Sequence, residues 1–313
     1  MIRSPDTRES CKPGRCTRRR PASFDAPYLM LWISIVILGI NWPIMKQALL
    51  HVTPFWMVAL RYCLSVPVIA VFVIVARHRL PKFERRDLRV ILGVALLQFV
   101  AQMGLVTLAL QWVPASTASI LIYTTPVWLV LIDRILCRQQ VSPRRLWPTL
   151  ASATGCVLVL LGAGQVGDVG PLLLILLAAL FWSSSMKLIA THNWMGDVRD
   201  ALFWQFLVAG VISLPIAFWM EGGMKFHSLS FAGLGLLAFV GPVATGLGFG
   251  LMVAVGRTLP VSQIALFSTL SPVIGFVSSA LLLGDPLNLM IVVGAGTLLL
   301  ALVWGALSSK SSA

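Results

Sequence analysis

The chain has 313 residues, of which 58% are hydrophobic and only 11% are charged, and its mean hydropathy is +0.89. A soluble globular domain carries about 25% charged residues, so this composition excludes a water-soluble fold and indicates an integral membrane protein. The formal net charge of +13 does not indicate nucleic-acid binding, because the basic residues lie in the N-terminal tail and in particular links between apolar segments.

The chain begins with a polar segment rich in arginine, which includes the triplet Arg18-Arg19-Arg20. A basic start before an apolar run is typical of a signal peptide, but the run over residues 27–50 is too long and lacks a small-residue cleavage site. We therefore expect residues 1–26 to form a disordered basic cytoplasmic tail, and the run that follows to be a retained membrane helix.

Ten apolar segments follow one another, and each approaches the roughly 20 residues that a helix needs to cross a bilayer. The apolar runs are continuous rather than alternating, which favours helices over a β-barrel. The sequence therefore predicts an all-α integral membrane protein with ten transmembrane helices. We place the spans at residues 28–49, 54–76, 89–110, 114–133, 146–164, 170–190, 201–220, 231–254, 260–283 and 287–308.

Lysine and arginine lie on alternate links between the spans, and such basic links are typical of the cytoplasmic side. The link after the second span holds Arg77, Arg79, Lys82, Arg85, Arg86 and Arg89, and the link after the fourth holds Arg134, Arg138, Arg144 and Arg145. The links on the other side are nearly bare, with Lys225 as the clear exception. This asymmetry predicts an even number of spans and two cytoplasmic termini in a bacterial-type inner (plasma) membrane.

The two halves of the chain carry similar residues at a constant offset. A shift of 146 residues places Pro114-Ala-Ser116 on Pro260-Val-Ser262, Pro126-Val127 on Pro272-Val273, and Gly104-Leu105 on Gly250-Leu251. Each half then holds five spans, an odd number, so the halves are inserted in opposite senses, as in secondary transporters with inverted repeats. We expect five-helix repeats at 27–164 and 165–308, and a short cytoplasmic tail at 309–313.

An ordered set of residues resembles the drug/metabolite transporter superfamily, specifically its ten-helix EamA-type members. The set comprises Gly39-Ile40-Asn41-Trp42-Pro43-Ile44-Met45-Lys46, then Pro54 and Arg61, the segment from Ser116 to Pro126 with its counterpart from Pro260 to Pro272, Ala178 to Trp182, and Gly284-Asp285. Pro43 departs from the usual pattern and predicts a kink in the first span. The resemblance covers residues 28–308 and implies export or exchange of small metabolites, amino acids or drugs, without naming the substrate.

Polar side chains inside a membrane are costly, so they tend to face a cavity or a partner. We expect the substrate pathway to be lined by Asn41, Lys46, Arg61, Gln98, Gln102, Ser116, Ser119, Tyr123, Trp182, Gln205, Gln263 and Thr269. Snorkelling or helix anchoring is the alternative for the lysine and the arginine, and hydrogen bonding between helices is the alternative for the glutamines.

The fourth and ninth spans carry related polar stripes. Ser116, Ser119 and Tyr123 share one helix face, and the shifted copy is Ser262, Ala265 and Thr269, so we expect the two stripes to face each other across a central path. Pro126 and Pro272 each remove a helix hydrogen bond. We expect a helix break or hinge at both prolines, with a purely structural kink as the alternative.

The middle of the spans lacks carboxylates and imidazoles, so the usual side chains of a proton relay are missing. Lys46 is the one side chain there that we expect to exchange a proton. The sequence also lacks a phosphate-binding loop, a metal motif and a nucleophile–base pair. We therefore expect no cofactor, no metal site, no enzymatic activity and no nucleic-acid partner.

These patterns favour a secondary transporter, an exporter or exchanger of small organic solutes, that works by alternating access between two inverted halves. The alternatives are a non-transporting membrane scaffold and an intramembrane enzyme that acts on lipids. The expected partners are a small-molecule substrate and the lipid bilayer. The sequence leaves substrate, direction, coupling ion and oligomeric state open, a homodimer included.

Overall fold

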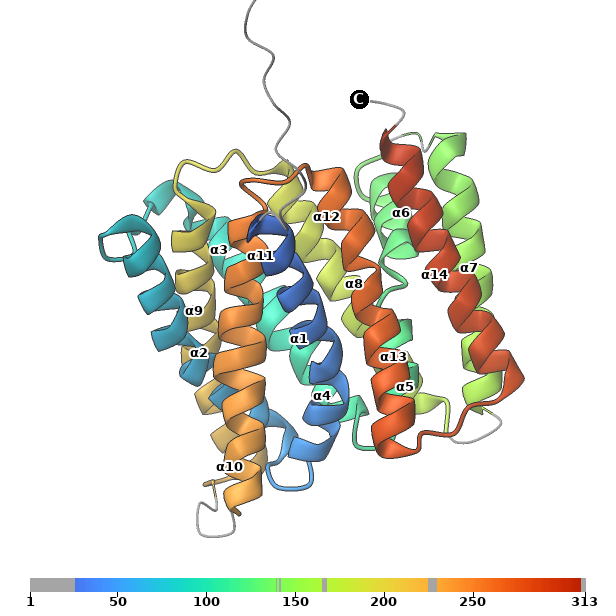
Figure 1. Cartoon of the computed structure of the whole chain (residues 1–313), viewed down its shortest axis with the longest axis horizontal. Helices are drawn as coiled ribbons and strands as arrows, with labels where there is room; N and C mark the ends of the chain where they lie inside the picture. The colour runs from blue at the N-terminus through green and yellow to red at the C-terminus, as the bar shows by residue number, and fades with distance from the viewer. Residues whose placement is uncertain (1–25, 139, 141, 165–167, 225–229, 311–313) are drawn as a thin grey trace, which may run out of the picture.

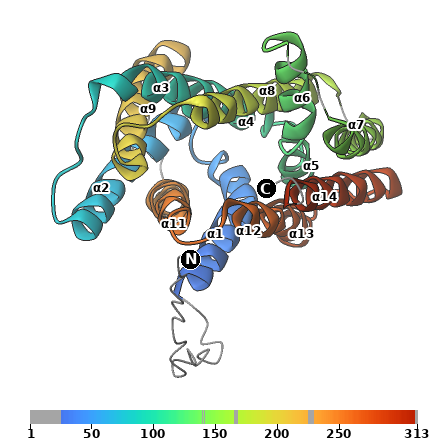
Figure 2. The ribbon, with the colours of Figure 1, turned by 90° about the horizontal axis from the view of Figure 1, so that it is seen from above.

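The structure, a computed structural model, describes residues 26–138, 140, 142–164, 168–224 and 230–310. Ten of its helical stretches are long and apolar enough to cross a membrane, and they lie side by side in one bundle (Figures 1 and 2). The described residues form helices, turns and loops, without strands. The predicted all-α fold with ten spans is therefore confirmed.

Several spans are built from more than one helical piece. In chain order the pieces are α1 (Ala26–Ala48), α2 (Pro54–Arg77), η1 (Arg85–Asp87), α3 (Leu88–Val94), η2 (Ala95–Gln102), α4 (Met103–Ala109), α5 (Ala115–Leu121), α6 (Thr125–Ile135), α7 (Pro143–Gly164), α8 (Gly170–Thr191), α9 (Val198–Glu221), α10 (Phe231–Ala238), η4 (Phe239–Gly248), α11 (Phe249–Val255), α12 (Val261–Ser268), α13 (Leu270–Leu283) and α14 (Leu289–Lys310). Pro43 lies inside α1, which continues through it to Ala48.

The bundle has two chemically different ends. The described chain begins and ends on the same side of the bundle (Figure 1). On this side α2 ends at Arg77, and α6 carries Arg134 in its last turn. We call this side the basic end. The other side, which we call the opposite end, carries Glu221 at the end of α9 and Asp285 between α13 and α14.

The third and eighth spans each contain a π-helix, a wider turn than the α-helix and one often found at functional sites. The segment η2 ends at Gln102 and η4 ends at Gly248, and the difference of 248 − 102 equals the 146-residue offset between the repeats. The pieces that follow, α4 and α11, have seven residues each. The repeat seen in a few sequence identities therefore extends to backbone irregularities that the sequence did not predict.

The fourth and ninth spans are both interrupted just ahead of a proline. Tyr123 and Thr124 leave the α-helical pattern, and their N–H groups bond carbonyls three residues back at 3.0 and 3.1 Å. Pro126 then stands in the first turn of α6, and Pro272 stands in the first turn of α13. A proline is tolerated in a first turn because its missing N–H would have no helical partner there.

The interrupted spans pack unequally at the two ends of the bundle. At the opposite end α5 packs along α13. The repeat maps α5 onto α12 and α13 onto α6, so α6 and α12 are the equivalent pair at the basic end. Among the described residues α6 and α12 do not pack closely together, and both views show them apart (Figures 1 and 2).

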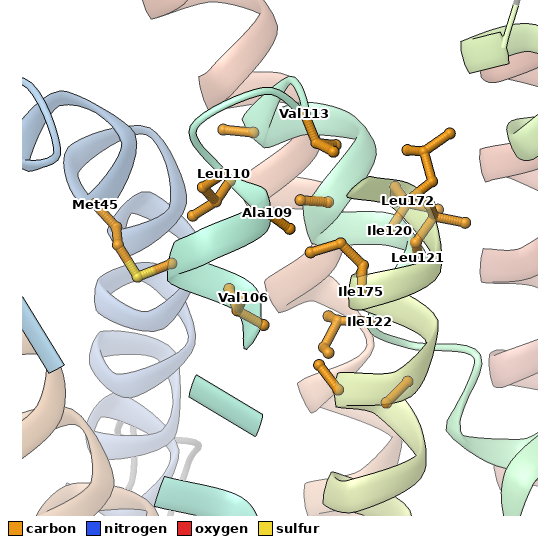
Figure 3. Close-up of a cluster of buried hydrophobic side chains, with 14 of the residues drawn as sticks. Met45, Val106, Ala109, Leu110, Val113, Ile120, Leu121, Ile122, Leu172 and Ile175 are labelled. Atoms are coloured by element: carbon orange, nitrogen blue, oxygen red, sulfur yellow. The ribbon is translucent and has the colours of Figure 1, made fainter. Parts of the chain in front are cut away.

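A buried apolar cluster lies beside the α5–α13 contact. Figure 3 shows its side chains coming from α1, α4, α5 and α8, with Met45 beside Val106 and Leu110 and with Ile175 beside Ile122. Because lipid tails are as apolar as these side chains, their close fit rather than their hydrophobicity stabilises the contact. The cluster therefore holds α1, α4, α5 and α8 together near the opposite end.

Candidate substrate pathway

Arg61 lies deep in the bundle, because α2 continues unbroken from Pro54 to Arg77 and carries it inward. Its side chain is only 2% exposed. Nε and Nη2 donate to Thr245 Oγ1 of η4 at 3.0 and 2.8 Å. Nη1 faces the sulfur atoms of Met45 and Met103 at 3.3 and 2.9 Å. The guanidinium carbon also lies 5.7 Å from the centroid of the Tyr62 ring.

Asn41 lies on the same face of α1 as Met45, one helical turn away. The residue is 7% exposed, and its Oδ1 is buried without a hydrogen-bond partner among the described residues. Gln102, at the end of η2, is also buried and directly precedes Met103. Side chains from α1, η4 and the start of α4 thus meet the Arg61 side chain of α2.

Lys46 lies nearer the opposite end than Arg61. Its Nζ donates to the carbonyl of Val113 at 3.0 Å and to the carbonyl of Leu110, at the turn after α4. These carbonyls have no partner further along the helix, so the ammonium satisfies acceptors that the helix end leaves free. The structure therefore gives Lys46 a role in fixing α1 to α4.

The predicted stripe on the fourth span contacts α13, the second piece of the ninth span, whereas Ser262 and Ala265 of the shifted copy belong to α12. Ser116 and Ser119 are fully buried, and Ser119 Oγ donates to the carbonyl of Ser116 at 2.7 Å. A Cβ placed on Gly275 of α13 would lie 3.1 Å from Ser119 Cβ and 2.8 Å from Trp42. The absent side chain at Gly275 is therefore what lets α1, α5 and α13 meet.

Tyr123 and Trp182 lie together at the break in the fourth span. Their rings are edge to face, with centroids 5.3 Å apart, and the Tyr123 hydroxyl lies beside Ser271 in the first turn of α13. Thr269 Oγ1 donates to the carbonyl of Leu266 at 2.6 Å, across the break in the ninth span. The two breaks thus bring polar and aromatic groups of both repeats close to each other.

Other predicted pathway residues lie away from these groups. Gln98 accepts a hydrogen bond from Ser185 of α8 at 2.8 Å, which is the helix-to-helix contact considered as its alternative. Gln263 accepts from Tyr28 at 2.8 Å near the basic end. Gln205 is buried in α9, outside the group around Arg61. The side chain of Ser262 lies outside the described residues.

Two cavities open elsewhere in the bundle. The larger, about 260 Å³, lies between α2, the η2–α4 junction, α8 and α9 and is lined mainly by apolar side chains such as Phe55, Leu105 and Phe181. The smaller, about 100 Å³, lies at the opposite end beside Thr117 and Asp168. Neither cavity is lined by a residue of the predicted pathway.

The comparisons with known proteins decide the family. A family model described as the EamA-like transporter family matches residues 26–161 and again residues 170–305. The chain belongs to the EamA-like transporter family. Membership in this family confirms the resemblance that the sequence showed over residues 28–308. The chain is therefore a multi-pass membrane transporter of the EamA type.

Named relatives in the EamA-like family are similar along most of their length. A probable amino-acid metabolite efflux pump of Salmonella typhimurium is 27% identical over 272 residues, which cover 83% of this chain and 88% of that protein. An uncharacterized transporter of Bacillus subtilis, YvbV, is 24% identical over 290 residues, covering 91% and 92%. A solved crystal structure matches with a TM-score of 0.58 at 18% identity, covering 91% of this chain and 97% of that one, and so supports the fold alone.

Sequence reasoning about this EamA-like chain missed the residues that surround Arg61. Thr245, Met45 and Met103 carry no signal of their own, because a threonine or a methionine in an apolar span is ordinary core. The 146-residue offset places Phe99 opposite Thr245, so the repeat does not point to the threonine either. The π-helix η4 brings Thr245 to Arg61, and its Oγ1 donates to the carbonyl of Val240 at 2.7 Å.

The basic end carries a cluster of ion pairs that sequence reasoning also missed. Asp197, the N-cap of α9, accepts from the backbone of Arg199 at 2.9 Å and pairs with Arg77, Arg199 and Arg257. Burial by itself raises the pKa of Asp197, but the hydrogen bonds and charges of Arg199 and Arg257 outweigh it and hold that pKa well below its ordinary value. One carboxylate therefore joins the ends of α2, α9 and α11.

Proposed function

We propose that this chain is a secondary transporter that exports or exchanges small organic metabolites, amino acids among them, by alternating access, with both termini in the cytoplasm. The observation that carries the proposal is the unequal packing of two equivalent helix pairs. In an inverted repeat, α5 with α13 and α12 with α6 are copies of one contact. The α5–α13 pair is packed together at the opposite end, whereas α6 and α12 lie apart at the basic end.

Exchange between these two arrangements is what alternating access requires, because one contact must open as the other closes. The basic end is the cytoplasmic side by the distribution of lysine and arginine, so the described state faces inward. The relatives named as probable amino-acid metabolite efflux pumps support amino-acid-related solutes and outward transport. Each half-helix break places polar backbone near the middle of the bundle, where such a solute would bind.

Solute flux tests this proposal. The full chain is reconstituted into liposomes loaded with an unlabelled amino-acid mixture, and uptake of the labelled mixture is compared with uptake by protein-free liposomes. We expect counterflow that depends on the loaded solute. A membrane scaffold would give no flux with amino acids, nucleosides, polyamines or cationic drugs. A lipid-acting enzyme would change the lipid composition of the liposomes, which mass spectrometry measures. Either result contradicts the proposal.

A further inference from the structure

The guanidinium of Arg61 is a buried cation whose partners are all electrically neutral. Arg61 is seven positions after Pro54 in α2, so its side chain starts roughly 10 Å from the opposite end of that helix. Its contacts are Thr245, the two methionine sulfurs and the Tyr62 ring. Within the described part of the chain no aspartate or glutamate pairs with it.

These partners leave the donors of Arg61 poorly satisfied. A guanidinium has five N–H groups, and here Nε and Nη2 share one hydroxyl oxygen of Thr245. Nη1 faces only thioether sulfurs, which are weak acceptors. A desolvated charge with such partners is costly, and a carboxylate is the acceptor that matches the paired donors of a guanidinium.

The side chains around Arg61 allow its weak methionine partners to be replaced by a carboxylate. Methionine side chains have three rotatable bonds and repack easily, so Met45 and Met103 can move aside without breaking a strong hydrogen bond. The Thr245 hydroxyl donates its own proton to Val240, so its oxygen faces Arg61 as an acceptor and keeps the guanidinium oriented. The cation is thus held in place on one side and open to replacement of its partners on the other.

Asn41 supplies a second, independent observation. Its Oδ1 is buried with no hydrogen-bond partner among the described residues, and it lies one helical turn from the Met45 that contacts Arg61. A buried acceptor without a donor is costly, so it points to a donor that arrives with a ligand. A structural role for Arg61 as a link from α2 to η4 needs Thr245 alone and does not account for this acceptor.

We propose that Arg61 binds the carboxylate of the transported solute and that Asn41 Oδ1 accepts a hydrogen bond from its amino group. The substrates are then small α-amino acids or closely related amino carboxylates, bound between α1, α2, η4 and the η2–α4 junction. This inference rests on the proposed transport function for its route to the site, and it adds the two residues that recognise the carboxylate and the amino group of the solute.

The test compares amino acids with their carboxamides, which keep the amino group but lack the negative charge of the carboxylate. Full-length protein in lipid nanodiscs is heated with glycine, L-alanine, L-threonine, L-leucine or L-phenylalanine, and in parallel with their carboxamides at equal ionic strength. We expect at least one acid to raise the unfolding midpoint by about 2–4 °C while its amide does not. Arg61→Gln should abolish this preference, weakening acid binding at least about tenfold, and Asn41→Leu should weaken amino acids more than the matching carboxylic acids without an amino group.

Control variants separate the site from folding. Arg257→Gln removes an arginine at the basic end, outside the site around Arg61, and should keep the preference. If Arg61→Gln does not fold, Arg61→Lys should fold, retain the preference for acids and bind them more weakly. Equal stabilisation by acids and amides, no stabilisation by any acid, or an unchanged preference in the folded Arg61 variant overturns the inference. Flux in liposomes is measured separately. Flux without a preference for acids overturns this inference alone. A preference for acids without flux contradicts the transport proposal alone.

Discussion

The carboxylate of Asp285 accepts a hydrogen bond from the backbone N–H of Ser116 at 2.8 Å, although the two residues are 169 positions apart in the sequence. Ser116 is in the first turn of α5, and Asp285 lies in the link between α13 and α14. A carboxylate at a helix N-terminus bonds free N–H groups and complements the helix dipole. The bond therefore ties the two repeats together where α5 and α13 are closed.

Removing this carboxylate should loosen the closed end. In a background without native cysteines, Ser119→Cys reports access from the opposite end to a membrane-impermeant thiol reagent. Asp285→Ala should raise the labelling rate by about tenfold, because a hydrogen bond to a charged group contributes about 1.5–3 kcal/mol. Asp168→Ala is the control: Asp168 lies at the same end and accepts a hydrogen bond from the nearby Gly170 backbone at 3.0 Å, within its own loop. An unchanged rate in Asp285→Ala would show that this bond does not hold the end closed.

Substitution of Asp197 should change stability in a pH-dependent way. The folded pKa of Asp197 lies below its ordinary value of 3.8, so its ion pairs stabilise the fold fully above about pH 4, and this contribution is lost as the pH falls further. Asp197→Asn should cost about 1–2 kcal/mol at pH 7 and progressively less below pH 4. Thermal unfolding from pH 3 to 7 measures this, with the exposed partner substitution Arg257→Gln expected to cost less. A difference between wild type and Asp197→Asn that does not shrink in acid would contradict the pKa assignment.

Two neighbouring glycines of α14 should respond differently to alanine. A Cβ at Gly294 would lie 2.8 Å from the Gly155 carbonyl oxygen and 2.8 Å from the Val159 nitrogen of α7, whereas a Cβ at Gly296 would meet nothing within 4 Å. Gly294→Ala should therefore force α14 away from α7 and destabilise the protein by about 1–3 kcal/mol. Gly296→Ala should be neutral or slightly stabilising. Denaturant unfolding of both variants checks this, and equal stabilities would mean that the two helices are not in close contact.

The topology prediction follows from the basic links. Reporter fusions after residues 80, 140 and 313 should report the cytoplasm, and fusions after residues 166 and 224 should report the outside. The physical reason is the retention of lysine- and arginine-rich links on the cytoplasmic side. An outside signal at residue 313 would imply an odd number of spans and remove the basis for two inverted halves.

Energy coupling through Lys46 stays a prediction, and two substitutions test it. Lys46→Ala removes the only proton-exchanging group that we expect within the spans and should abolish uphill transport while leaving some counterflow. Lys46→Arg keeps donors for the Leu110 and Val113 carbonyls but holds its proton at any working pH. It should therefore retain the α1–α4 contact and still lose uphill transport. Intact proton-driven transport in either variant would place the coupling elsewhere.

Much of the fold follows from local sequence patterns. An apolar run long enough to cross a bilayer must form a helix, because lipid offers no hydrogen-bond partner for the backbone, so the ten spans could be read directly. Pro126 and Pro272 lie in the first turns of α6 and α13, just after the interruptions of the two spans, where a proline is tolerated because its missing N–H would have no helical partner. The two π-helices were not readable, because an inserted turn leaves no distinctive residue in apolar sequence.

The candidate site could be predicted only in part. Polar side chains in the spans identified Asn41 and Arg61 as unusual, since a polar group in lipid carries a cost wherever it lies. The same reasoning grouped them with Gln98 and Gln263, which the structure places with Ser185 and Tyr28 instead. The free-energy cost of a polar side chain in lipid indicates that the residue needs a partner, but it does not indicate which residue that partner is.

The sequence by itself thus determined the membrane class, the ten spans and their repeated order, because hydropathy, charge and proline act over short stretches of chain. Tertiary structure alone decided which groups meet. Thr245 reaches Arg61 across 184 residues of sequence, and Asp285 reaches Ser116 across 169. It also decided that α5 and α13 are together while α6 and α12 are apart. Two halves with equivalent sequence patterns can pack in either sense, so the choice between them depends on contacts between distant segments, which no local pattern records.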